Sequence, residues 1–252
     1  MGQLKYFSFV SFILIVSAFA NAGALSPNLL PPDSPNKPHL ITYTASKIFA
    51  PMGFDDNDNA QVVVYGKYPN TCYKVGPVQT SINEQTHEVQ ITSQAYFYDG
   101  CWCLDVLVPY TQVVSLGVIK TGQYKLKLQG RDGKSRDMGE LPIAVSTGPG
   151  PDDYLYAPVR EASIDTATDG TKILVLRGNY GNTCMQYRDS KVYYRDSNVI
   201  EVLPILNMGN QNCRDASVPF EIKVALKPSQ AGDTLVHIRS LNGQSINLMA
   251  EF

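Results

Sequence analysis

Apolar and polar side chains alternate along much of this chain. Within residues 88–98 one face carries Val89, Ile91, Ala95 and Phe97, and the opposite face carries Gln90, Thr92, Gln94 and Tyr96. Shorter apolar runs occur at 62–64, at 106–108 and at alternate positions of 124–128. A period of two residues is the pattern of a β-strand with one solvated face. No stretch indicates a helix, so we predict an all-β fold.

One module occurs twice. Two sets of residues share the same order, namely Gly66, Tyr68, Asn70, Thr71, Cys72, Cys103, Asp105, Val108 and Pro109, and Gly178, Tyr180, Asn182, Thr183, Cys184, Cys213, Asp215, Val218 and Pro219. The Gly and Pro residues of 146–153 mark a linker between them. We therefore predict two domains, residues 39–145 (the first module) and 154–252 (the second module).

Each module has about 100 residues with short strands and regular turns, which is typical of an immunoglobulin-like β-sandwich. The predicted fold class is therefore two tandem immunoglobulin-like β-sandwiches. The short linker predicts that they are held end to end with limited freedom.

The first 38 residues have the pattern of an export signal and a leader. Residues 1–22 contain Lys5, an apolar run and the small residues Ala20, Asn21 and Ala22, which predict a signal peptide cleaved before Gly23. Residues 23–38 are rich in proline and predict an extended leader. No second apolar stretch is long enough to cross a bilayer. We expect an exported protein, periplasmic or secreted, without membrane insertion after cleavage.

Charge argues against a nucleic-acid partner. The 21 Lys and Arg residues are scattered among 23 Asp and Glu residues, and the net charge is −2. Binding to phosphate backbones usually requires clustered basic residues. A protein or a glycan of the cell envelope is the partner class that we expect.

A family resemblance follows from the order of residues in the first module. The residues that carry it are Gly66, Tyr68, Pro69, Asn70, Thr71, Cys72, Tyr73, Cys103, Val108, Pro109, Tyr110, Leu116, Gly117, Gly122 and Tyr124. This order resembles a recurrent exported bacterial β-sandwich domain of unknown function. The match is weaker in the second module, where Gly181 replaces Pro69 and Thr234 replaces Tyr124. The resemblance implies a fold and an envelope location, and it implies no catalytic residue.

Five cysteines in an exported chain predict two disulfides and one residue left over. The aligned modules make Cys103 the counterpart of Cys213, which predicts the pairs Cys72–Cys103 and Cys184–Cys213. Cys101 is then the odd thiol. It is either buried and inert or available to pair with a second chain or to exchange with Cys103.

Asp55, Asp56, Asn57, Asp58 and Asn59 place five oxygen-bearing side chains in a row before a strand. Calcium takes six to eight oxygen ligands, and the string is similar to the Asp-x-Asn-Asp-Asn linker of cadherins. The other acidic motifs of cadherin sites are missing. The alternative is a solvated Asx turn that begins the strand.

Three aromatic residues are candidates for recognition. Tyr96 and Tyr98 lie on the face opposite Phe97, where tyrosine is either a contact residue or ordinary strand filler. Trp102 has the same parity as Leu104 and Val106 in a strand that the sequence predicts to be continuous, which favours burial over an exposed anchor. The three histidines, at positions 39, 87 and 237, lack metal-ligand spacing and are expected in solvated strands or loops.

No catalytic motif is present, neither a nucleophile elbow, nor a phosphate loop, nor a zinc helix. We predict a non-enzymatic binding or structural module of the bacterial envelope, with no cofactor except calcium if the acidic turn binds it. The alternatives are a protease inhibitor or other enzyme regulator, and a calcium-stiffened adhesive stalk.

Overall fold

The computed structural model describes residues 37–100, 102–195, 198–209, 212–227 and 231–252. Every element of regular secondary structure in these ranges is a β-strand, as the sequence predicts. The predicted signal peptide and residues 23–36 of the leader lie outside the described residues. The strands up to the linker are β1 His39–Thr42, β2 Lys47–Phe49, β3 Phe54–Asp55, β4 Ala60–Tyr68, β5 Tyr73–Asn83, β6 Glu88–Phe97, β7 Val108–Gly117, β8 Gly122–Gln129 and β9 Ser135–Ala144. The strands after it are β10 Val159–Thr166, β11 Lys172–Asn182, β12 Met185–Arg195, β13 Val199–Met208, β14 Asp215–Leu226, β15 Asp233–Ser240 and β16 Gln244–Glu251.

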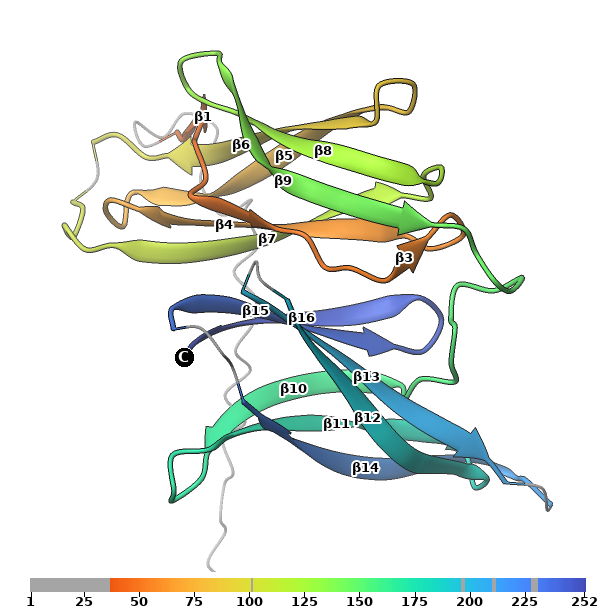
Figure 1. Ribbon diagram of the computed structural model, residues 1–252. Helices are drawn as coiled ribbons and strands as arrows, with labels where there is room; N and C mark the ends of the chain where they lie inside the picture. The colour runs from red at the N-terminus through yellow and green to blue at the C-terminus, as the bar shows by residue number, and fades with distance from the viewer. Residues whose placement is uncertain (1–36, 101, 196–197, 210–211, 228–230) are drawn as a thin grey trace, which may run out of the picture.

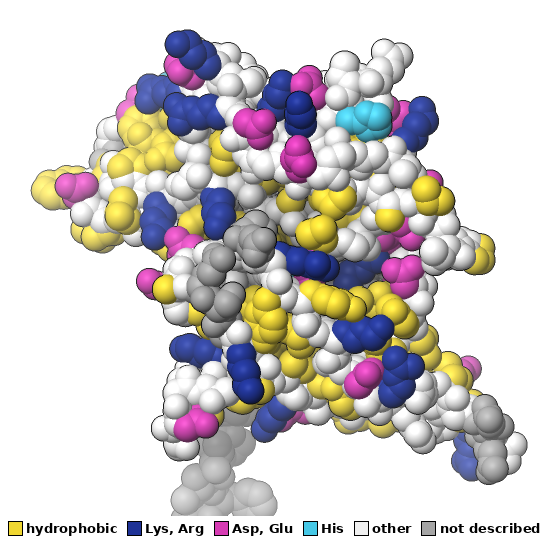
Figure 2. Space-filling model, viewed as in Figure 1, with side chains coloured by type: hydrophobic (Ala, Val, Ile, Leu, Met, Phe, Trp, Pro, Cys, Tyr) yellow, Lys and Arg dark blue, Asp and Glu magenta, His cyan; other side chains and the backbone are white. Residues whose placement is uncertain are grey.

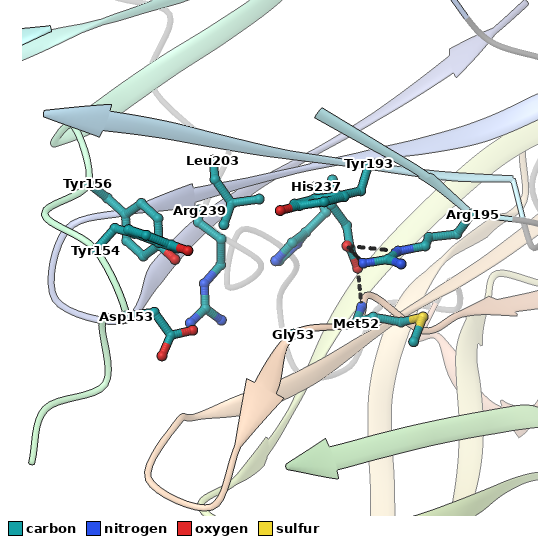
Figure 3. Close-up of a pocket in the computed structure, with 11 residues that line it drawn as sticks. Met52, Gly53, Asp153, Tyr154, Tyr156, Tyr193, Arg195, Leu203, His237 and Arg239 are labelled. Atoms are coloured by element: carbon teal, nitrogen blue, oxygen red, sulfur yellow. Dashed lines mark hydrogen bonds and ion pairs between the residues drawn. The ribbon is translucent and has the colours of Figure 1, made fainter. Parts of the chain in front are cut away.

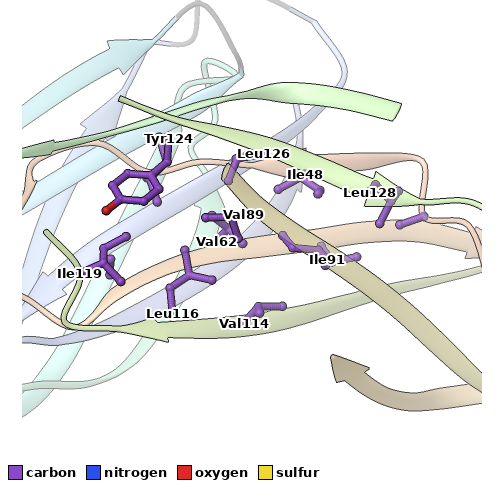
Figure 4. Packing of buried hydrophobic residues seen from close by; sticks show 14 of the residues in the cluster. Ile48, Val62, Val89, Ile91, Val114, Leu116, Ile119, Tyr124, Leu126 and Leu128 are labelled. Atoms are coloured by element: carbon purple, nitrogen blue, oxygen red, sulfur yellow. The ribbon is translucent and has the colours of Figure 1, made fainter. Parts of the chain in front are cut away.

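The first module is a β-sandwich. One sheet has the order β1-β6-β8-β9-β3, with β5 also paired to β6, and the other sheet has the order β2-β4-β7. The inward side chains of both sheets form a single core, in which Val62, Ile91, Tyr124 and Leu126 are fully buried (Figure 4). Burial of this apolar surface is the main stabilising contribution to the module.

The strands after the linker form two further sheets. Sheet β10-β11-β14 faces sheet β12-β13-β15-β16 around a separate core that includes Leu174, Val202 and Val236. The pairing of β6 with β8 is parallel, and so is the corresponding pairing of β13 with β15. Figure 1 shows the first module above the second, with the linker along one side.

The repeated glycines have the same structural role in both modules. Gly66 pairs with Tyr110 across β4 and β7, and Gly178 pairs with Phe220 across β11 and β14. A Cβ atom on Gly66 would lie 2.6 Å from the Tyr110 ring, and one on Gly178 would lie 2.8 Å from the Phe220 ring. The aromatic rings therefore occupy the space that a side chain would need.

The two modules pack face against face, and the prediction that they are held end to end is wrong. An interface cluster of Phe49, Val63, Tyr65, Val199 and Leu235 joins them, with Met249 packed against it. The reason lies in β4, which is apolar on both faces. Val62 and Val64 point into the core of the first module, while Val63 enters the interface cluster.

Among the residues that the structure describes, no helix is long and apolar enough to cross a membrane.

Candidate functional sites

Two disulfides join the cysteine pairs that the aligned modules predict. Cys72 is bonded to Cys103 with their Cα atoms 5.4 Å apart, and Cys184 is bonded to Cys213 with their Cα atoms 5.3 Å apart. Such bonds persist in oxidising compartments, so they are compatible with an exported protein. The predicted odd thiol, Cys101, lies outside the described residues.

An exposed apolar loop follows the first disulfide. The prediction that Trp102 is buried in a continuous strand is wrong, because β7 begins only at Val108 and residues 102–107 are not part of a strand. The side chains of Trp102, Leu104 and Leu107 are 99%, 68% and 68% exposed. Figure 2 shows hydrophobic side chains protruding at the left edge of the first module, where Figure 1 places this loop. We call residues 102–107 the apolar loop.

Hydrogen bonds to a threonine hold this loop, and the same bonds hold the corresponding segment of the second module. The backbone NH of Leu104 donates to Thr71 Oγ1 at 2.9 Å, and the NH of Thr71 donates to the carbonyl of Leu104 at 3.1 Å. The second module has the same two bonds between Arg214 and Thr183, at 3.2 and 3.1 Å. The repeated Asn-Thr pair therefore forms part of a turn in both modules.

The apolar character of the loop belongs to the first module alone. At the positions aligned with Leu104, Val106 and Leu107 the second module has Arg214, Ala216 and Ser217. Because the same turn forms with these polar and small residues, the fold does not require apolar side chains there.

The other two recognition candidates, Tyr96 and Tyr98, do not belong to the apolar loop. The backbone NH of Tyr98 donates to the carbonyl of Cys72 at 3.0 Å, so Tyr98 follows β6 beside the disulfide. Tyr96 lies inside β6, where its ring is partly exposed. Only Trp102 belongs to the apolar loop.

The acidic turn lies at the contact between the modules. Asp55 Oδ1 accepts from the NH of Asn57 at 3.3 Å, which is an Asx turn as one interpretation predicted. That interpretation is wrong about solvation, since Asp55 and Asp58 are buried. Both carboxylate oxygens of Asp58 accept from Arg239 Nη2, at 3.0 and 2.9 Å. Burial raises the pKa of Asp58, and the guanidinium of Arg239 opposes this shift.

The remaining side chains of the turn also have protein partners. Asp56 accepts from the NH of Ser146 at 2.8 Å and from Thr121 Oγ1 at 3.0 Å. Asn57 Nδ2 donates to the carbonyl of Gly148, and Asn59 Oδ1 accepts from Ser115 Oγ. Within the described residues, no three His, Cys, Asp or Glu side chains are grouped as metal ligands. The turn therefore holds the linker and the second module in place.

A pocket of about 230 Å³ lies beside this contact (Figure 3). Met52 and Gly53 of the first module form one side, and side chains of β12, β13, β15 and the segment 153–156 form the rest. Glu201 is a buried residue of this lining. Its Oε1 accepts from the NH of Met52, and its Oε2 accepts from Arg195 Nη2 at 2.8 Å. We call this the junction pocket.

His237 lines the junction pocket and is fully buried, so the prediction that it is solvated is wrong. It lies on β15 opposite Glu201, and its ring meets that of Phe54 edge to face, with the centroids 5.8 Å apart. Burial lowers the pKa of His237 to about 4, so the imidazole is neutral at pH 7. Its Nε2 atom has no hydrogen-bond partner among the described residues.

Sequence reasoning did not find Glu201, His237 or Arg239. One signal was available for Glu201, which is the one ionisable residue of the largely apolar strand β13. Burial of such a residue needs a partner. The partners come from distant positions, which the local pattern does not show.

A family model matches part of this chain. Residues 62–136 match the family model of the ORF11 beta-sandwich domain. The matched region runs from β4 into the beginning of β9 and includes the first disulfide and the apolar loop. No curated protein matches, and no solved structure matches. The family match supports a β-sandwich and leaves the activity to be argued from the residues.

Proposed function

We propose that this chain is an exported, non-enzymatic binding module of the bacterial cell envelope, and that it binds a protein partner through the apolar loop. The observation that carries the proposal is the exposure of Trp102, Leu104 and Leu107 on a loop anchored by a disulfide. Grouped exposed apolar side chains commonly mark interaction sites. Tryptophan is also enriched among the residues that dominate binding energy.

Charge favours a protein over a lipid surface. Residues 102–107 contain no Lys or Arg and include the acidic Asp105. An anionic membrane attracts basic segments and repels carboxylates. An apolar recess on a protein fits the loop better, because burial of the loop in such a recess needs no basic residue.

The test exchanges three apolar residues of the loop for their counterparts in the second module. The variant Leu104→Arg, Val106→Ala, Leu107→Ser carries the residues of the second module, so we expect its free energy of unfolding to change by about 0.5 kcal/mol or less. Crosslinking in the native envelope, followed by mass identification, should recover a partner with wild type and lose it with this variant. The control Val118→Ser, Val145→Ser removes two other exposed valines and should keep the partner. Equal recovery from all three proteins would overturn the proposal.

A second candidate function, protease inhibition, is favoured by the same loop. A protruding segment braced by a disulfide can occupy a protease cleft while resisting cleavage. Inhibitors of this kind form stable complexes of standard interface size. Incubation with envelope and secreted proteases distinguishes the two functions, since an inhibitor gives a stoichiometric complex with an intact loop and a simple binding module does not.

The proposal treats the buried carboxylates as structural groups. Glu201 is bound by Arg195 and by the Met52 NH, and Asp58 is bound by Arg239. A carboxylate held in this way is poorly placed to exchange protons with a substrate. Export is supported by the signal pattern of residues 1–22 and by the disulfides, and N-terminal sequencing of the mature protein should begin at Gly23.

We assign no calcium to the acidic turn, because Arg239 occupies both carboxylate oxygens of Asp58. The melting temperature should therefore be the same in excess EDTA and in millimolar CaCl₂. An increase with CaCl₂ that Asp56→Asn abolishes would instead support the calcium-stiffened stalk.

A further inference from the structure

The junction pocket is formed by both modules, which makes it a property of the whole molecule. Met52 and Gly53 come from the first module, while Tyr193, Glu201 and His237 come from the second. Its volume of about 230 Å³ is smaller than the ~300–1,000 Å³ of pockets that hold drug-sized ligands. The space therefore fits a small molecule of about one ring.

His237 presents a hydrogen-bond acceptor to this space. Asn247 Nδ2 donates to Gln61 Oε1 at 3.4 Å, which leaves Asn247 Oδ1 facing His237 Nδ1 at 2.8 Å. The neutral imidazole must then carry its proton on Nδ1, so Nε2 has a lone pair. Figure 3 shows the imidazole directed toward the centre of the pocket. A buried acceptor without a partner is costly, and a hydroxyl group donated by a ligand would satisfy it.

Two ion pairs account for three of the charged residues that line the pocket, and Asp153 adds one further carboxylate to the lining. Glu201 is paired with Arg195, and Arg239 is paired with Asp58. A charged ligand would have to displace one of these partners or enter without a counter-ion, and both are costly at buried positions. The two existing pairs and the carboxylate of Asp153 therefore favour an uncharged ligand over an anionic one.

Two tyrosines supply further hydroxyl groups. Tyr154 and Tyr193 line the pocket, and Figure 3 shows their hydroxyl groups directed into it from opposite sides. Lys191 Nζ donates to the Tyr154 hydroxyl oxygen at 2.8 Å, so the proton of that hydroxyl can be donated to a ligand. Tyrosine rings with polar tips combine apolar walls with hydrogen bonding.

We propose that the junction pocket binds a neutral, hydroxyl-rich ligand of about one sugar ring, with one ligand hydroxyl donating to His237 Nε2. Tyr154 and Tyr193 hold the ligand from either side. This site is separate from the apolar loop and does not depend on the proposed partner.

The test uses the mature chain from Gly23 with uniform ¹⁵N labelling. The probes are the neutral sugars glucose, galactose, mannose and N-acetylglucosamine, with glucuronate and glucose 6-phosphate as charged comparators. Saturation-transfer NMR reports binding, and the ¹⁵N resonance of His237 Nε2 reports the site. At least one neutral sugar should bind with a Kd of about 1 mM and shift that resonance.

Variants locate the binding. Tyr193→Phe removes one hydroxyl and should weaken the binding of that sugar about 5- to 10-fold. Tyr187→Phe removes a hydroxyl from the same strand, outside the pocket, and should leave the affinity unchanged. The loop exchange described above should also leave it unchanged, which separates this inference from the proposed function.

Three results would overturn the inference. The first is that no neutral sugar binds up to about 50 mM, well above the expected Kd. The second is that a neutral sugar binds without any shift of the His237 resonance. The third is that only the charged comparators bind.

Discussion

At the scale of single residues, His237 makes stability depend on pH. Its pKa is about 4 in the folded protein because of burial, and about 6.5 in the unfolded chain. Between these values the unfolded chain binds a proton that the folded protein does not, so stability decreases as pH falls from 6.5 to 4. The full change is roughly 3 kcal/mol of unfolding free energy.

The comparison is between wild type and His237→Gln, with urea unfolding followed from pH 7.5 to pH 4. Carboxylates also titrate in this range, so the informative quantity is the difference between the two proteins. We expect wild type to lose its stability advantage over the variant as the pH falls. Two parallel curves would contradict a neutral buried imidazole. The charged and polar groups near the ring are Arg239, Glu201 and Asn247.

The paired glycines give a second prediction at this scale. Gly66→Ala and Gly178→Ala each place a methyl group against an aromatic ring, and in the second module also 2.3 Å from the carbonyl of Pro158. Forcing a methyl group into occupied space costs about 1–3 kcal/mol.

Thermal unfolding should show a decreased melting temperature for both variants, with the larger effect at Gly178, where the obstacle is backbone. Gly181→Ala is the matched control, because a Cβ there meets nothing within 4 Å. A control as destabilised as Gly178→Ala would show that the loss comes from the backbone of β11 and not from the ring contact.

Single residues also show where sequence reasoning succeeds. The cysteine pairs could be predicted because the repeat supplies an internal alignment. The burial of His237 and the exposure of Trp102 could not be predicted, for opposite reasons. Alternation predicts burial only while a strand continues, and the strand ends before Trp102. Residue type alone predicts that a lone histidine is solvated, but His237 of the second module is buried against Phe54 of the first.

At the scale of elements, each disulfide stabilises the loop that it closes. In the second module the bond joins residues separated by 29 positions. The chain-entropy relation gives about 3–4 kcal/mol for a loop of that size. The double variant Cys184→Ala, Cys213→Ala should lose this amount in a urea unfolding experiment.

The second module is the better place for this measurement, because Cys101 could replace Cys103 as a partner of Cys72 in the first. The control is Cys101→Ser, which keeps both disulfides and should change the free energy of unfolding by less than about 0.5 kcal/mol. A loss below about 1 kcal/mol in the double variant would mean that the unfolded chain is already compact without the bond.

The strands themselves were predictable to different degrees. Alternation identified β6, where one face is buried and the other is partly solvated. The continuous run Val62–Val64 also identified a strand, but not what covers its second face. That information lies in β13 and β15, which are far away in the sequence. Local patterns predict that an element exists, and its neighbours depend on the whole chain.

At the scale of the whole molecule, the contact between modules couples their stability. The interface cluster supplies apolar burial, and the Asp58–Arg239 pair supplies a buried ionic contact across 181 positions of sequence. Removing one partner of a buried ion pair costs about 3–5 kcal/mol, because the other charge is left without compensation. The modules should therefore unfold together in wild type, with one calorimetric transition.

Arg239→Met should separate that transition into two, because it leaves the Asp58 carboxylate buried and unpaired in the interface. Asp58→Asn removes the charge and keeps an oxygen that can accept from the NH of Asp55. The double variant should recover part of the loss, so a cycle of the two single variants and the double variant should give a coupling energy of about 1–3 kcal/mol.

Simple additivity, with a coupling below about 0.5 kcal/mol, would show that the modules are joined by the apolar cluster alone. In that case Val63→Thr, which places a hydroxyl in the cluster, should be the substitution that separates the two transitions, because an unpaired buried hydroxyl weakens apolar burial.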